Sequence, residues 1–521
     1  MGRKYENFVH CLNAKKAGLF VSIIFFLTLL PILYVGLHNY ASGDDYWYGV
    51  HTYRGLVEDG LVGALKGSLL TVSEFYKNWQ GTWFTMFLFT LSPHHFHEKG
   101  YVITTFLALG LLIGSFSYLA DFYLNQKLKF GRGATTVIVC LVLYPAIQYI
   151  PRTTSGLFWF NGIMHYSVPF FLAVLAVVQS HKFLETKRKR NYVILFVCFV
   201  LLGGGSYLVP LAATLAVTLI MISRIKILPS GEKKKKYHLF CNWSDLYILL
   251  AFLAELIGLI ISFLAPGNRI RGGEEFGADP KWALQCIYYA IDRGIYLGED
   301  YFLKNPITSI IYLLIALMTW QLMWKNRSLN LRFRFPLLFV LYMNGIYWAC
   351  YVPEIYSRSD VSGGVPNTYF HIFLIITLAN IIYVTGWCQN RLVLLWKKQT
   401  GCIDPVARPT GRLAFLCPGR FKKYILIPAI AAFSVLLPII THFSPLITTN
   451  QYCEEYIRSG KLAKYEKVRE EQYRILTDPS IQDAVVPEVD FDLYPVVHMP
   501  LPNENQRLYY NKQSISVYLV D

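Results

Sequence analysis

The stretch "AGLFVSIIFFLTLLPILYVGL", residues 17–37, decides the fold of this chain. A helix rises about 1.5 Å per residue, so roughly 20 apolar residues in a row cross the hydrocarbon layer of a membrane. Arg3, Lys4, Lys15 and Lys16 precede the run, as basic residues precede the core of a signal peptide. The run is too long for such a core, so it predicts a retained transmembrane helix with a cytoplasmic N-terminus.

Similar runs recur along most of the 521 residues, of which 54% are hydrophobic and 16% charged. An average soluble domain is about a quarter charged. The sequence therefore predicts an all-α polytopic membrane protein with about eleven transmembrane helices. The predicted spans are 17–37, 101–120, 134–150, 163–181, 192–205, 206–223, 245–265, 306–324, 335–352, 368–388 and 424–441.

The basic residues follow these spans in a regular way. Alternate loops are rich in Lys and Arg, which is typical of cytoplasmic loops. These loops are "NQKLKFGRG", "HKFLETKRKRN", "KILPSGEKKKKYHLF", "WKNRSLNLRFR" and residues 389–423. The net charge of +16 is thus a topology signal, and we expect a lipid bilayer and no nucleic acid as partner. The pattern predicts a multi-pass membrane protein whose C-terminus is extracytoplasmic.

Two segments are long enough to form structure outside the membrane. The first outer loop, residues 38–100, contains "LVGALKGSLLTVSEFYKNW", which indicates an amphipathic helix lying on the membrane. Its apolar stretch 82–95 is too short for a span, so we expect a re-entrant or interfacial helix. The tail, residues 442–521, combines a charged helical pattern with the strand-like "SISVYLV" and predicts a small α/β appendage to a transmembrane domain of residues 1–441.

The first outer loop begins with two adjacent carboxylates, Asp44 and Asp45, among aromatic residues. Neighbouring side chains point in different directions, so we expect one carboxylate to accept a proton or bind a hard cation and the other to orient the acceptor. A divalent cation such as Mg²⁺ or Mn²⁺ would use one of them. A hydrated cap at the start of a loop explains the pair equally well.

The loop before the fourth span carries Trp159, Asn161 and His165. Asn161 and His165 are four residues apart and share a helix face. The ring would stack on a sugar, and the amide and imidazole would bind its hydroxyls. An N-cap at Asn161 and an interfacial aromatic belt are the alternative interpretation.

The segment "APGNRIR" ends the seventh span and places Arg269 and Arg271 at the predicted outer interface. Arginine is unexpected there, and its planar guanidinium suits phosphate. Arg358, the one basic residue of the loop 353–367, is a further phosphate candidate. Lipid headgroups at the interface are an alternative partner for these side chains.

Four segments resemble a known group of enzymes: "SGDDYWY", "NWQGTWF", "LFWFNGIMHYSVP" and "FLAPGNRIR". Their order is similar to that in GT-C superfamily glycosyltransferases, and closest to an uncharacterised bacterial family related to Gtr-type O-antigen glucosyltransferases. The tail pattern "NENQRLYYN" shares in this likeness. Two departures concern the acceptor side: Gly81-Thr82 stands where the family often has Gly-Arg, and "GGGSYLVP" lacks the acid that the family tends to carry.

The resemblance implies an inverting transferase that uses a polyprenyl-phosphate-linked sugar on the outer face of a bacterial inner membrane. Its acceptor would be a surface glycopolymer, similar to a teichoic acid or an O-antigen. Asp44 and Asp45 would be catalytic, and the arginines Arg269, Arg271 and Arg358 would bind the donor phosphate. The sugar and acceptor contacts would come from Trp79, Trp159, Asn161, His165 and Asn268. A transporter or flippase of lipid-linked saccharides and a non-catalytic scaffold of polysaccharide assembly are the alternatives.

Overall fold

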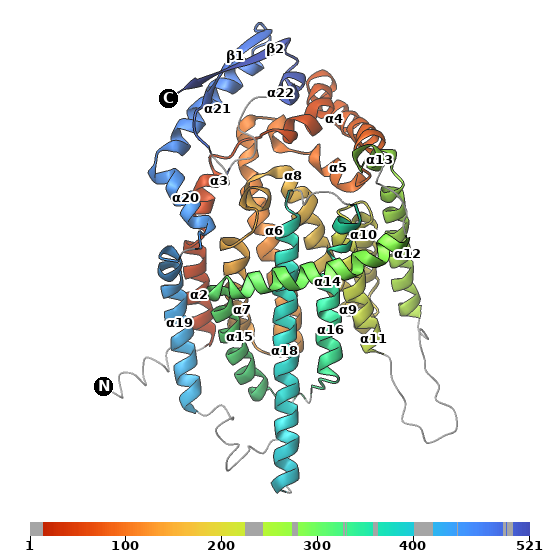
Figure 1. Cartoon of the computed structure of the whole chain (residues 1–521), viewed down its shortest axis with the longest axis vertical. Coiled ribbons are helices and arrows are strands. Elements are labelled where there is room, and N and C mark those ends of the chain that lie inside the picture. Colours follow the sequence, from red (N-terminus) through yellow and green to blue (C-terminus); the bar gives the residue numbers. More distant parts are fainter. Residues whose placement is uncertain are drawn as a thin grey trace.

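The computed structural model describes residues 14–224, 243–272, 280–326, 329, 331–357, 363–400, 420–444, 446–492, 496 and 504–520. Helices make up most of it (Figure 1). In the first half of the chain they are α2 (Ala14–Leu27), α3 (Leu30–Gly36), α4 (Asp44–Asn78), α5 (Trp83–Phe89), η1 (Pro93–His95), η2 (Glu98–Val102), α6 (Ile103–Ala120), η3 (Asp121–Lys127), α7 (Arg132–Gln148), η4 (Thr154–Phe158), α8 (Phe160–Gly162), η5 (Ile163–Ser167), α9 (Val168–Thr186), α10 (Lys189–Leu202), α11 (Leu208–Ser223) and α12 (Trp243–Phe263). In the second half they are α13 (Pro266–Gly272), α14 (Pro280–Leu303), α15 (Pro306–Lys325), α16 (Pro336–Ala349), α17 (Val352–Ser357), α18 (Val365–Thr400), α19 (Arg420–His442), α20 (Thr449–Arg458), α21 (Lys461–Thr477) and α22 (Glu504–Tyr509), with the strands β1 (Asp483–Val489) and β2 (Ser514–Val520).

Helix α7 lies at the centre of the bundle. Every residue from Val137 to Gln148 is buried, and α2, α6, α15 and α18 pack around it. Small residues let the backbones approach, as at Gly18, where an added Cβ would lie 2.8 Å from the Gly133 carbonyl oxygen. Close packing through small residues is typical of helices in membranes.

The surface of the bundle is apolar where lipid would contact it. Helix α12 exposes a run of leucines and isoleucines that includes Leu253, Leu256 and Ile260, each close to half exposed. A water-soluble surface rarely carries so large an apolar patch. Within the described residues, five helices are long and apolar enough to cross a membrane, or six if the bent pair α2 and α3 counts as one span. The membrane character is therefore confirmed.

The eleven predicted spans correspond to helices of very different lengths. Each of the eleven predicted ranges falls on a helix, but several of these helices are short, such as α7, α11 and the 14-residue α10. The count of eleven stays a prediction. The stretch 82–95 forms only the seven-residue helix α5 and a 3-10 turn. At about 10 Å, α5 is too short to cross a bilayer.

Helix α4 folds back on itself as a hairpin. Its two arms meet at Asp59 and Gly60, whose backbone leaves the helical conformation, with φ of 60° at Gly60. The arms touch through glycine, since a Cβ on Gly67 would lie 2.1 Å from the His51 carbonyl oxygen. The sequence predicted the second arm as a helix but missed the first.

Helix α14 runs across the other helices of the bundle (Figure 1). It buries only Cys286, Ala290 and Gly294, at i, i+4 and i+8, and exposes the apolar side chains of its other face. This pattern is typical of a helix lying in a membrane interface. Helix α14 lies within residues 266–305, for which no helix was predicted from the sequence.

The tail and the first loop meet at the upper end of the molecule in Figure 1. Strands β1 and β2 pair in parallel from Asp483 and Ser514 to Val489 and Val520, and α21 covers them. Helices α4, α5, α13, α21 and α22 gather at this end, and α18 extends from the other. The first outer loop, α13 and most of the tail therefore share one end of the bundle, whereas α14, within the predicted outer loop 266–305, crosses the bundle lower down.

Candidate functional site

The aspartate pair begins helix α4. Gly43, with φ of 53°, makes the turn that starts the helix, so Asp44 and Asp45 are its first two residues and point in different directions. Asp45 is fully buried, whereas Asp44 is partly exposed. The two carboxylates therefore have different surroundings, as the sequence predicted.

Asp45 holds the turn together. Its Oδ2 accepts hydrogen bonds from the Tyr101 hydroxyl at 2.6 Å and the Ser42 amide at 3.0 Å. The Tyr101 hydroxyl in turn accepts a hydrogen bond from the Phe160 amide at 2.8 Å. Asp45 thus connects the first loop to the segment that carries Trp159 and Asn161, which is a structural role.

Burial raises the pKa of Asp45 to about 7, against the opposing effect of its hydrogen bonds from Tyr101 and Ser42. The folded state therefore holds the proton of this carboxyl more tightly than the unfolded state does. This difference in pKa stabilises the folded state fully below about pH 4, and the stabilisation is lost as the pH rises to about 7. We therefore compare the melting temperatures of the wild-type protein and of Asp45→Asn in detergent. The wild-type value, relative to that of the variant, should fall as the pH rises from about 4 to about 7. Parallel pH profiles for the two proteins would contradict this assignment.

Asp44 lies within the field of Arg271. Burial raises the pKa of the Asp44 carboxyl above its usual value, and the Arg271 guanidinium partly offsets that rise. Burial also raises the pKa of Tyr48, whose hydroxyl lies in the field of both Asp44 and Arg271. A carboxylate with a raised pKa beside a cation is a common arrangement at functional sites.

Arg271 is positioned by the segment that follows α4. Its guanidinium lies over the Trp79 ring, 4.9 Å from the centroid, and one of its nitrogens donates to Gln80 Oε1. The side chain is otherwise exposed. Its cation is thus held next to the site and remains accessible to an anion.

Asn268 connects the same two segments. Its Oδ1 accepts from the Gly81 amide at 3.1 Å, and its Nδ2 donates to the Ser262 carbonyl at 2.7 Å. Glycine is required at the contact, because a Cβ on Gly81 would lie 1.8 Å from the Ser262 oxygen. Both ends of the Asn268 amide therefore bind the chain itself.

The third predicted segment lies next to α5. His165 Nδ1 is 2.9 Å from the Thr85 hydroxyl oxygen. The positive charge of Arg271 is close enough to interact with the His165 imidazole. Asn161 lies in α8 and is 1% exposed. Within the described part of the chain, neither atom of its side-chain amide has a hydrogen-bond partner. Trp159 precedes α8 in an extended conformation and is half-buried.

The structure thus brings together Asp44, Trp79, His165, Asn268 and Arg271, with Asp45 and Asn161 behind them. Arg269 is exposed on the same short helix, α13. Arg358 lies outside the described residues, so its predicted role has no structural counterpart.

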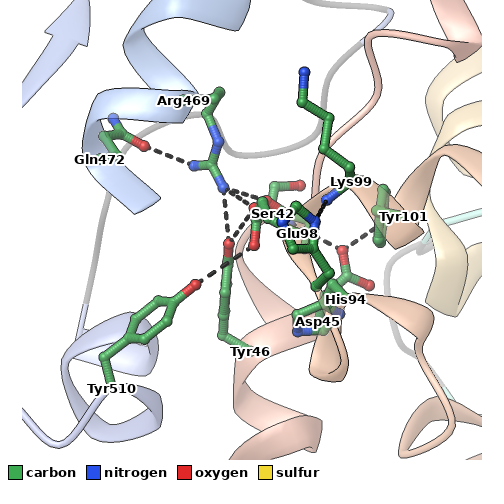
Figure 2. Close-up of polar contacts among 12 residues, drawn as sticks. Ser42, Asp45, Tyr46, His94, Glu98, Lys99, Tyr101, Arg469, Gln472 and Tyr510 are labelled. Atoms are coloured by element: carbon green, nitrogen blue, oxygen red, sulfur yellow. Dashed lines mark hydrogen bonds and ion pairs between the residues drawn. The ribbon is translucent and has the colours of Figure 1, made fainter. Parts of the chain in front are cut away.

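The sequence analysis missed a buried ion pair behind this site (Figure 2). Arg469 of α21 and Glu98 are each 3% exposed, and Arg469 Nη2 lies 2.5 Å from Glu98 Oε1. The same nitrogen donates to the Ala41 carbonyl at 3.1 Å and to the Tyr46 hydroxyl at 2.7 Å. Arg469 therefore holds the chain on both sides of the Asp44–Asp45 turn.

Helix α22 makes further contacts with the first loop. The Tyr509 ring stacks on Tyr53 at 4.2 Å, and its hydroxyl lies 2.9 Å from His95 Nδ1. Arg54 donates to the Leu508 carbonyl at 2.5 Å. The tail is thus packed into the first loop. The one sequence signal for this contact was the "NENQRLYYN" pattern, which contains α22.

The predicted divalent cation at this site stays a prediction. Mg²⁺ takes six oxygen ligands, and waters and substrate phosphates commonly supply most of them. Asp44 is the one carboxylate that faces the site, since Asp45 Oδ2 is bound to Tyr101 and Ser42, and the positive Arg271 lies nearby. Among the described residues, no group of three or more potential metal ligands is found. No step is therefore derived through a metal.

No protein-family model matches this chain, and a search of curated proteins found no match.

Proposed function

We propose that this chain is an inverting membrane glycosyltransferase of the GT-C type. It moves a sugar from a polyprenyl-phosphate donor to a glycopolymer on the extracytoplasmic face of a bacterial inner membrane. The observation that carries the proposal is that Arg271, on α13, stacks on the Trp79 ring and lies close enough to Asp44, on the first loop, to lower the pKa of its carboxyl. These are a proton acceptor, an anion-binding group and a sugar-stacking surface in one place.

The chemistry needs a base and a group that stabilises the leaving phosphate. Asp44 takes the proton of the acceptor hydroxyl, whose oxygen then attacks the anomeric carbon. The bond from that carbon to the lipid phosphate oxygen breaks on the opposite side, so the configuration inverts. Arg271, with Arg269 on the same helix, binds the phosphate as its negative charge grows.

The aromatic and polar residues would position the sugar. Trp79 holds Arg271 against its ring, so a sugar packed against Trp79 would lie next to a phosphate bound by Arg271. His165 supplies a hydrogen-bond group on the α5 side, with the buried side chain of Asn161 behind it. Arg358 belongs to this proposal on sequence alone.

Mass-spectrometric comparison of surface polysaccharide from cells with and without the protein tests this function. We expect one sugar substituent to disappear from the polymer while the polymer itself remains. Loss of the whole polymer with lipid-linked saccharide retained inside the cell would instead indicate a flippase. A smaller amount of polymer with unchanged composition would indicate a scaffold.

A further inference from the structure

A cationic surface lies at the end of the bundle opposite the Asp44–Arg271 site. The turn from α9 to α10, the end of α11 and the start of α12 meet there. Figure 1 shows α12 running from this end of the bundle up to α13. The exposed basic residues of the cationic surface are Lys187, Arg188, Lys189, Arg190 and Arg224.

Two of these cations are fastened to neighbouring residues in the first turn of α12. Lys187 Nζ donates to the Ser244 hydroxyl. Arg224 Nη1 lies 3.3 Å from Asp245 Oδ1. The ammonium and the guanidinium are therefore held close together, although they come from different helix ends. Burial lowers the pKa of Lys187, and the positive charge of Arg224 lowers it further, against the opposing effect of Asp245. An anion beside both cations would relieve their repulsion.

The backbone at Lys187 is unusual for a lysine. It ends α9 in the left-handed conformation, with φ of 56°. Glycine is the usual residue at such a helix end, because it makes this turn without strain. Lysine occupies the turn at an energetic cost, and the turn brings its ammonium to α12. An ammonium has three N–H donors and a guanidinium five, so one bond each to α12 leaves further donors for phosphate oxygens.

The start of α12 supplies an apolar surface next to the two cations. Leu246 and Leu250 lie on one face of the helix and are 46% and 42% exposed, and they continue into the lipid-facing side of α12. Trp243, on the same face, is 79% exposed. The Tyr247 ring packs against that of Tyr192, with 4.9 Å between centroids. Exposed Trp and Tyr beside an apolar helix face are typical of a membrane–water interface.

The charges favour an anionic lipid over a zwitterionic one. Within the described residues, the cationic surface carries five basic side chains, and Asp245 is the carboxylate paired with one of them. Glu185, just before the turn, pairs with Lys127 instead. Phosphatidylcholine carries a choline cation next to its phosphate, and these basic side chains would repel it. Basic residues at the predicted cytoplasmic boundary attract the anionic headgroups of the inner leaflet.

We propose that Lys187 and Arg224 bind the phosphate of an anionic phospholipid in the cytoplasmic leaflet, with its acyl chains along the start of α12. The lipid site is separate from the Asp44–Arg271 site. The proposal therefore holds whether or not the chain transfers sugar.

Native mass spectrometry of the detergent-purified full chain tests the proposal. The probes are dioleoyl phosphatidylglycerol and dioleoyl phosphatidylcholine, added separately, and the measurement is the affinity for the first bound lipid. We expect wild type to bind phosphatidylglycerol about 30-fold more tightly. Lys187→Gln and Arg224→Gln should each weaken that binding about fivefold, and the double variant should bind the two lipids about equally. Both side chains are exposed, so these changes remove little packing.

Two control variants locate the binding. The double variant Lys397→Gln, Lys398→Gln removes two cations from the last turn of α18, at the same end of the bundle, and should keep the preference for phosphatidylglycerol. Lys187→Arg keeps the charge and should also keep it. The proposal is overturned if wild type binds both lipids equally, if Lys187→Gln and Arg224→Gln bind as wild type does, or if the α18 variant loses the preference. Displacement of the lipid by equimolar glycerol 3-phosphate would also overturn it, because the site would then bind a free phosphate ester.

Discussion

Replacing Asp44 with asparagine is expected to reduce sugar transfer by roughly 10²–10⁴-fold, the usual contribution of a general base. Asparagine has nearly the same shape as aspartate but cannot accept the proton of the attacking hydroxyl. Asp44 is partly exposed at the first turn of α4, so the change removes little packing. The measurement is the sugar content of the surface polysaccharide at equal amounts of protein in the membrane.

The matched control for this variant lies in the same helix. Asp59 is 65% exposed at the tip of the α4 hairpin and faces Lys66 at 3.6 Å, a surface pair of little energetic value. Asp59→Asn should therefore transfer sugar as wild type does. If Asp44→Asn does so too, Asp44 is not the base and the proposed mechanism fails.

Replacing Arg469 with methionine is expected to destabilise the contact between the tail and the first loop by about 3–5 kcal/mol. The substitution leaves the Glu98 carboxylate buried at 3% exposure without its cation. It also removes the bonds to the Ala41 carbonyl and the Tyr46 hydroxyl. The measurements are the melting temperature of the purified protein and the rate at which a protease cleaves the tail.

Two further variants separate the buried pair from a general effect of lost charge. Arg474 is 75% exposed and pairs with Glu471, so Arg474→Met should change the melting temperature little. The double variant Glu98→Gln, Arg469→Met should recover part of the loss, because no unpaired charge remains buried. Equal melting temperatures for Arg469→Met and Arg474→Met would show that the buried pair does not hold the tail.

Much of the transmembrane part follows from local sequence. Runs such as 245–265 are apolar on all sides, and each gives a helix at the predicted place. Helix α14 was missed because its charged and aromatic residues lower its average hydropathy. Its helical spacing of buried residues is recognisable only when Cys286, Ala290 and Gly294 are known to face inward. The hairpin in α4 depends on contacts between its two arms, and these contacts cannot be inferred from residues that are neighbours in the sequence.

The site was predicted in part for the same reason. Asp44 and Asp45 lie in an unusual segment and were found directly. Their different surroundings depend on Tyr101, which comes from a different helix. The partners Glu98 and Arg469 are far apart in the sequence, and each resembles an ordinary surface residue until the fold brings them together.

The central claim is that Asp44 and Arg271 face the extracytoplasmic side, and thiol labelling tests it most directly. Arg271→Cys would be treated in intact spheroplasts with a membrane-impermeant maleimide, with wild type as the baseline. Lys397→Cys, in the last turn of α18 at the other end of the bundle, is the control. We predict that Arg271→Cys is labelled in intact spheroplasts and Lys397→Cys only after they are permeabilised. The reverse pattern would place the site in the cytoplasm and contradict the account.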